Sequence, residues 1–179
     1  GRGGGFPTAR GAHSPAELAR QTAKIVAALT ALDADIIGLQ ELENDYGQGP
    51  RSAAQSLVEA LNAAVGAGAY AYVDPGRSRI GDDQIAVGLL YRPGIVRLAP
   101  GTVPRILDTP AELFRGEGSN RAALAATFEI VDEERADYGA RLTIAVNHFK
   151  SKGLSVLGGS GACPEAPNCD QGDGQGNWN

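Results

Sequence analysis

The chain has 179 residues, of which 42% are hydrophobic and 21% charged, and this balance is typical of one globular domain with an ordinary core. It excludes a chain that is disordered throughout, and no apolar run approaches the roughly 20 residues of a membrane-spanning helix. The formal net charge of −5 argues against a nucleic-acid binder that depends on overall positive charge, so contact with a polyanion would need a local site, with bound cations as the expected means. The chain begins with Gly1 and contains no methionine, so we expect it to be processed or partial.

A helix is predicted first, after a glycine-rich segment over residues 1–12. Ser14 can cap this helix, Pro15 suits the first helical position, and Glu17 completes a capping box. The helix is expected to end near Asp33. Side chains at helical spacing predict one inward face, made of Leu18, Thr22, Ile25, Val26, Leu29 and Leu32.

A buried strand and a second helix are predicted next. Residues 35–40 form an apolar run without polar alternation, which is typical of a strand buried on both faces. Residues 52–65 predict a helix that Gly66 and Gly68 stop. The inward side of this helix is expected to consist of Leu57, Val58, Leu61 and Val65.

The rest of the chain predicts mainly strands and loops. Short apolar runs predict strands over residues 69–73, 84–91, 95–98, 122–130 and 142–149. Residues 99–120 contain Pro and Gly and predict a loop, as do residues 151–179. This order favours a mixed α/β sandwich over a doubly wound parallel sheet, because in the latter helices and strands would alternate throughout. The helices should cover one outer face of packed sheets.

Glu41 stands where the first buried strand is expected to end. A divalent cation such as Mg²⁺ takes one or two carboxylates together with water and substrate oxygens, and a strand end can hold such a ligand rigidly. Taken alone, the acidic segment 41–45 is explained more simply as a solvated turn.

His148 is expected at the C-terminal end of an apolar strand, and Lys150 and Lys152 follow it. A histidine that is neutral near pH 7 can move a proton, and neighbouring cations can hold a phosphate. The alternative is a structural histidine beside two surface lysines. The other histidine, His13, lies in the N-terminal segment and is given no role.

Arg121 and Asp74 are weaker candidates. Arg121 precedes a predicted strand, and its guanidinium is shaped for two bonds to one phosphate, although most isolated arginines are simply surface residues. Asp74 follows the predicted strand over residues 69–73 and precedes Pro75 and Gly76. The alternative for Asp74 is an ordinary turn with Asp at its first position.

The two cysteines, Cys163 and Cys169, lie in one polar, glycine-rich segment. A disulfide between them would indicate an oxidising compartment, and two unrelated thiols are the alternative. No neighbouring side chains complete a zinc set, and we expect the disulfide.

Four segments, in this order, resemble motifs of the endonuclease/exonuclease/phosphatase superfamily. Residues 34–44 are similar to its first metal-ligand motif and residues 81–93 to its central strand, and residues 119–124 and 147–153 follow as expected. The ending, residues 169–179, is similar to the bacterial extracellular nuclease branch. Four ordered motifs are far more specific than any one of them.

The resemblance implies a four-layered α/β sandwich of mixed sheets flanked by helices, and a secreted, metal-dependent phosphodiesterase that cleaves DNA. It implies Glu41 as a ligand of the catalytic divalent metal, Mg²⁺ first, with Ca²⁺ or Mn²⁺ as alternatives. It implies His148 in proton transfer or phosphate binding and Asp74 as the carboxylate that orients it. Phosphate contacts are expected from Arg121, Asn147 and Lys150.

Other motifs of the superfamily are missing from the sequence, among them a Gly-Asp-Phe-Asn-type segment and an Asp-His pair. We therefore expect residues 1–179 to form one domain truncated at both ends, with little or no activity by itself. Two alternatives stay open: a phosphatase or phospholipid phosphodiesterase of the same superfamily, and a non-catalytic binding module with the same fold. The leading hypothesis requires that Glu41 and His148 open into the same place.

Overall fold

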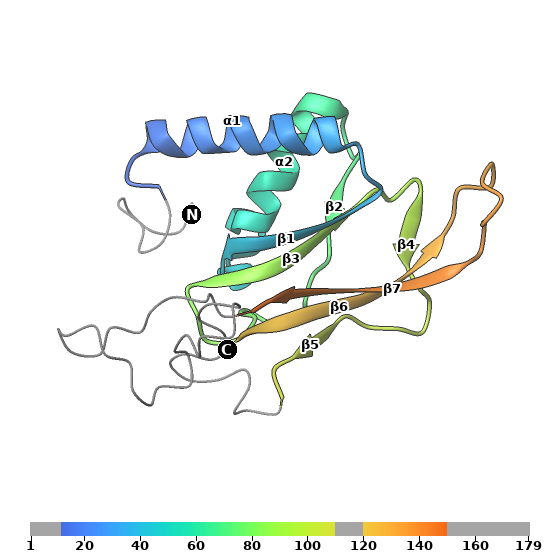
Figure 1. The fold of residues 1–179 in the computed structure, drawn as a ribbon. Coiled ribbons are helices and arrows are strands. Elements are labelled where there is room, and N and C mark those ends of the chain that lie inside the picture. The colour runs from blue at the N-terminus through green and yellow to red at the C-terminus, as the bar shows by residue number, and fades with distance from the viewer. Residues whose placement is uncertain (1–11, 110–119, 150–179) are drawn as a thin grey trace, which may run out of the picture.

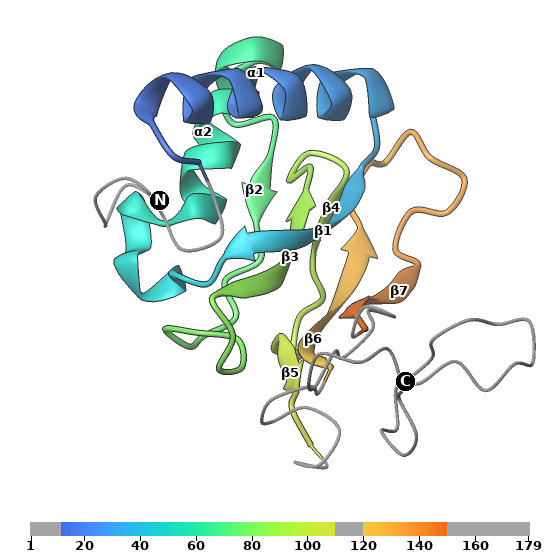
Figure 2. The same ribbon diagram turned by 60° about the vertical axis from the view of Figure 1, so that its left-hand side comes forward.

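The computed structural model describes residues 12–109 and 120–149, and these residues form three layers (Figure 1 and Figure 2). Helices lie on one side of a three-stranded sheet, and a four-stranded sheet lies on its other side. All strand pairings described are antiparallel. Helices with two sheets confirm the expected mixed α/β class, and the fourth layer stays a prediction. No helix in the described ranges has the length and apolar character that a membrane span requires.

Both helices begin where the sequence predicts. Helix α1 spans Pro15–Leu32, and the Ser14 hydroxyl accepts a hydrogen bond from the Glu17 amide at 3.2 Å. Helix α2 spans Ala53–Val65, and Ser52 caps it in the same way. Each cap satisfies one of the amides that a helix start leaves without an intrahelical partner.

The inward faces of the two helices differ in width. In α2 the predicted face is confirmed, because Leu57, Val58 and Leu61 are all buried. In α1 the predicted face is too wide, since Leu29 is buried but Ile25 and Leu32 are 45% and 58% exposed. Within the described residues, α1 packs mainly on α2.

The first sheet has the order β1-β3-β2, and its strands span Ile36–Glu43 for β1, Ile85–Tyr91 for β3 and Ala71–Tyr72 for β2. The central strand β3 is buried almost throughout, because helices cover one face of the sheet and the second sheet covers the other. Strand β1 is longer than predicted. Its pairing with β3 continues past Gln40, so Glu41 lies inside the strand and not beyond its end.

The second sheet is built around the long strand β6, Arg121–Ile130. Strand β7, Arg141–His148, pairs along one edge of β6, and two short strands pair along the other edge: β4, Val96–Leu98, and β5, Arg105–Leu107. Strand β5 corrects the predicted loop over residues 99–120. These three residues become a strand because β6 offers them backbone partners.

The main core lies between the two sheets. The side chains of Leu124 and Phe128 on β6 have no exposed surface, and they pack with buried residues of β3 such as Val87 and Leu89. The Phe128 ring also contacts the Tyr91 ring, with 5.5 Å between centroids. This packing sets the separation of the sheets and therefore of any side chains at their rims.

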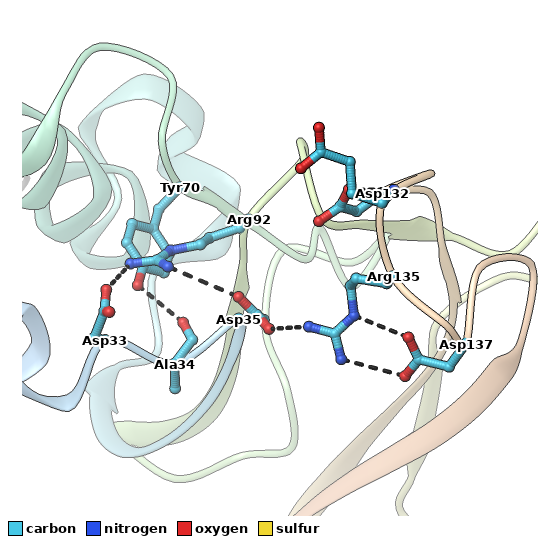
Figure 3. Close-up of polar contacts among 9 residues, drawn as sticks. Asp33, Ala34, Asp35, Tyr70, Arg92, Asp132, Arg135 and Asp137 are labelled. Atoms are coloured by element: carbon cyan, nitrogen blue, oxygen red, sulfur yellow. Dashed lines mark hydrogen bonds and ion pairs between the residues drawn. The ribbon is translucent and has the colours of Figure 1, made fainter.

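A chain of ion pairs joins the layers at the end of β1 that is far from Glu41 (Figure 3). Arg92, just after β3, contacts Asp33 after α1 and lies 3.7 Å from Asp35. Asp35 in turn lies 3.2 Å from Arg135, in the connection between β6 and β7, and Arg135 contacts Asp137. Exposed pairs of this kind each add little stability, but together they fix how the second sheet meets this end of β1.

A 3-10 helix, η1 (Tyr46–Arg51), leads from β1 into α2 and was not predicted. Asp45 precedes it, and its Oδ1 accepts a hydrogen bond from the Ala53 amide at 2.9 Å. Its Oδ2 is buried without a hydrogen-bond partner within the described residues. Burial raises the pKa of the Asp45 carboxyl, and nearby Glu43 adds to the rise, against the Ala53 hydrogen bond, which lowers it.

Asp45→Asn is expected to flatten the dependence of stability on pH. Because the folded-state pKa lies above the ordinary value of 3.8, the folded chain keeps this proton to higher pH than the unfolded chain, and stability falls as pH rises through that interval. The variant lacks this titration and keeps an acceptor for Ala53. Urea unfolding should show it at least as stable as the wild type at neutral pH, with the advantage lost in acid. Asp82→Asn, at an exposed carboxylate, controls for general loss of charge. Parallel wild-type and Asp45→Asn profiles would contradict the prediction.

Candidate active site

Glu41 lies on a β-bulge in β1. The register of β1 against β3 shifts between Leu39 and Leu42, so Gln40 and Glu41 together lie opposite the single residue Val87. Glu41 has φ 59, in the left-handed region that residues other than glycine seldom adopt. A bulge re-aims the side chain that it carries, and this carboxylate is 69% exposed.

A second bulge lies in β6, beside the end of β7. The register shifts between Arg121 and Leu124, so two alanines lie opposite Asn147. Arg121 pairs directly with His148, the last residue of β7. Residues that face each other in an antiparallel pair carry their side chains on the same face, so the strand pairing alone brings Arg121 beside His148.

In both sheets a side chain bonds the carbonyl opposite the bulge. The Val87 carbonyl accepts a hydrogen bond from the Tyr46 hydroxyl at 2.9 Å, and burial raises the pKa of this hydroxyl, which keeps it a neutral donor. The Asn147 carbonyl accepts a hydrogen bond from the Gln40 side-chain amide at 2.6 Å. Because a bulge disrupts the ladder, these side chains replace backbone partners.

Glu41 and His148 meet across the two sheets. Oε1 of Glu41 lies 3.7 Å from Nε2 of His148, and the ends of β1 and β7 that carry them lie on the same side of the molecule (Figure 1). The histidine side chain is only 14% exposed. A largely buried imidazole therefore faces an exposed carboxylate, as the sequence hypothesis required.

Arg121 is held by a carboxylate for which the sequence offered no role. Its Nε donates to Oδ2 of Asp83 at 2.9 Å, and both side chains are largely buried. Asp83 belongs to the segment before β3, so this ion pair crosses from one sheet to the other. A guanidinium has five N–H donors, of which this bond uses one, so the pair orients Arg121 without using up its capacity to bind an anion.

Asn44, which follows β1, holds the segment that carries Asp83. This asparagine is 2% exposed. Its Oδ1 accepts from the Ile80 amide at 2.9 Å, and its Nδ2 donates to the carbonyls of Ile80 and Asp83, each at 2.8 Å. The buried amide thus uses both of its polar atoms to shape the backbone beside Arg121.

Two further predicted site residues, Asp74 and Asn147, are exposed. Asp74 is exposed, and its Oδ1 accepts from the Gly76 amide at 2.8 Å, which is the turn arrangement considered as its alternative. Asn147 is exposed on the face of β7 opposite to that of His148, because successive strand residues alternate. Contact of Asp74 with His148, and of Asn147 with phosphate, stay predictions. Lys150, Cys163 and Cys169 lie outside the described residues.

Three residues at this end of the sheets were missed from the sequence: Gln40, Asn44 and Asp83. Each acts through a partner far along the chain, at sequence separations of 107, 36 and 38 residues. The only local signal was that Gln40 and Asn44 lie close to Glu41 in the sequence, and this closeness does not indicate which residues they bond. Asp83 precedes a strong strand pattern, but an acidic residue there is ordinary for a turn.

The described residues offer a hard cation few protein ligands at this site. Within residues 12–109 and 120–149, no group of three or more His, Cys, Asp or Glu side chains is arranged to hold a metal ion. Glu41 supplies an exposed carboxylate next to His148. Since Mg²⁺ keeps several waters and accepts one or two carboxylates with substrate oxygens, this donor set fits such an ion.

Comparison with known proteins places the chain in a family. No curated protein matches it. The family model described as Endonuclease/Exonuclease/phosphatase family matches residues 3–150, which is most of the chain and includes every residue that the structure describes. The matched region contains both bulges, Glu41, Arg121 and His148. The chain therefore belongs to the endonuclease/exonuclease/phosphatase family.

Proposed function

We propose that the chain is part of a secreted nuclease of the bacterial extracellular type, which hydrolyses phosphodiester bonds in DNA with a divalent metal, Mg²⁺ first. The family is hydrolytic, and its members generally use divalent metals on phosphoester substrates. The observation that carries the proposal is the approach of Glu41 to His148 from separate sheets, at 3.7 Å. The sequence motif over residues 169–179 supports the secreted branch, and a fourth layer belongs to the same proposal.

The chain's own groups suit the needs of phosphodiester cleavage. Glu41 would hold the metal, which when bound neutralises phosphate charge and makes a coordinated water more acidic. His148, largely buried and at the end of β7, would accept or hold a proton at Nε2. Arg121, bonded to Asp83 and paired with His148, would contact a non-bridging phosphate oxygen.

Metal binding tests the proposal without the need for turnover. The chain contains two histidines, so NMR resolves the ring signals of His13 and His148. We expect paramagnetic Mn²⁺ to broaden the His148 signals at millimolar concentration and to affect His13 much less. Glu41→Gln should abolish this selectivity, because the amide keeps the shape and loses the charge. Glu59→Gln, at an exposed carboxylate on α2, should behave as the wild type.

Broadening of His148 that survives in Glu41→Gln would contradict Glu41 as the metal ligand. In parallel, plasmid nicking with Mg²⁺ by the 179-residue chain is expected to stay close to background, because the Gly-Asp-Phe-Asn-type segment and the Asp-His pair of the superfamily are missing from its sequence. Any cleavage that remains should favour DNA over a phosphomonoester or sphingomyelin. A preference for either of these would move the assignment to a phosphatase or a phospholipid phosphodiesterase.

A further inference from the structure

The side chain of Gln40 joins the two sheets next to the proposed active site. Its Nε2 donates to the backbone carbonyl of Asn147 at 2.6 Å, and the two residues are 107 positions apart. Gln40 immediately precedes Glu41, and Asn147 immediately precedes His148. The bond therefore links the backbone supports of the two side chains that face each other.

We propose that Gln40 is a positioning residue, which holds Glu41 and His148 at working distance by tying the bulge of β1 to the end of β7. The inference rests on the proposed function only because it takes Glu41 and His148 as the functional pair. The bond of the Gln40 side chain goes to a backbone carbonyl. Its effect passes through backbone position.

The local geometry explains why a side chain is needed here. Both strands are irregular at this point, because Gln40 lies on one bulge and Asn147 lies opposite the other. A disrupted ladder constrains a strand less than a regular one does, so β1 and β7 need a further restraint. The hydrogen bond from Gln40 to the Asn147 carbonyl, opposite the β6 bulge, supplies this restraint from the neighbouring sheet.

The sheets also approach closely enough for one glutamine to span them. A Cβ added at Gly38 would lie 3.0 Å from Cγ2 of Val146, so β1 and β7 are in tight contact just before the Gln40 bond. At the other end of β1, the connection between β6 and β7 is tied by the ion pair of Asp35 with Arg135, at 3.2 Å. The two links hold the second sheet against both ends of β1, and the Gln40 link is the one beside the site.

Gln40→Met tests the proposal, because methionine has the length of glutamine and no donor. In the metal-free 179-residue chain, nuclear Overhauser contacts between the Glu41 side chain and the His148 ring report their proximity directly. We expect these contacts to weaken several-fold in Gln40→Met while thermal unfolding shifts little, because Gln40 is exposed. The matched control is Gln21→Met on α1, where the side-chain amide bonds Glu17 within one helix and both contacts and unfolding should stay unchanged.

A second readout separates this idea from the proposed function. With Mn²⁺ bound, the broadening of His148 should be weaker in Gln40→Met than in the wild type at equal metal occupancy. If Mn²⁺ does not broaden the His148 signals in the wild type, the metal role of Glu41 is wrong. The positioning role of Gln40 is then tested by the metal-free contacts. Metal-free contacts that are as strong in Gln40→Met as in the wild type would overturn the positioning role, whatever the metal does. If instead the variant unfolds at much lower temperature, Gln40 serves the fold in general and the proposal is wrong.

Discussion

Phe128→Ala is expected to lower the free energy of unfolding by about 4 kcal/mol, the largest effect of any substitution considered. Phe128 has no exposed surface, lies at the centre of the core between the sheets, and contacts the Tyr91 ring at 5.5 Å. Truncation removes the buried ring and leaves a cavity that β-sheets on both sides cannot close, because their strands are held by backbone ladders. Urea unfolding followed by circular dichroism measures the change.

Phe149→Ala provides the matched control for the same chemical change. Phe149 is 70% exposed, so its truncation should alter the free energy of unfolding by less than about 0.5 kcal/mol. If both phenylalanine variants lose similar stability, the space between the sheets is not the main core. Loss of stability only in Phe128→Ala supports the view that this packing sets the separation of Glu41 and His148.

Asn44→Ala is expected to lower the free energy of unfolding by about 3 kcal/mol, because it removes a buried side-chain amide. The Ile80 amide then loses its acceptor, and the carbonyls of Ile80 and Asp83 lose their donor. The segment before β3 should loosen, and Asp83 with it, so Arg121 loses the support that orients it. Hydrogen exchange is the sharpest measurement. The Ile80 amide should exchange much faster in the variant, while amides in α2 stay protected.

Asn44→Asp separates the contribution of the acceptor Oδ1 of Asn44 from that of its donor Nδ2. The carboxylate keeps an acceptor for the Ile80 amide and loses the donor to the two carbonyls, so we expect Ile80 to stay better protected than in Asn44→Ala. Both variants should still be less stable than the wild type. Equal protection of Ile80 in the wild type and in Asn44→Ala would show that Asn44 does not hold this segment.

Much of the fold could be predicted from the sequence because its signals are local. Ser14 with Glu17, and Ser52 ahead of α2, mark helix starts through side chains within one turn, and the apolar run of β3 marks a strand buried on both faces. Strand β5 could not be predicted in this way. Its three residues carry no strand pattern of their own and become a strand only by pairing with β6.

The candidate site was predicted in its main residues and not in its supports. Glu41 and His148 stand next to recognisable strand patterns, so their residue types and places could suggest chemistry. The bulge that re-aims Glu41 depends on the register of β1 against β3, and a register is a property of two strands. The partners of Gln40 and Asp83 depend further on how the two sheets pack, which no local pattern encodes.

Because Glu41 has a left-handed backbone conformation, thermal stability and the proposed metal binding favour different residues at position 41. Glycine fits that conformation without steric cost, whereas glutamate occupies it under strain. A library of variants sorted for survival at high temperature would therefore enrich glycine at residue 41 and discard the carboxylate. Engineering of this chain for durability should leave residue 41 untouched and seek its gains elsewhere.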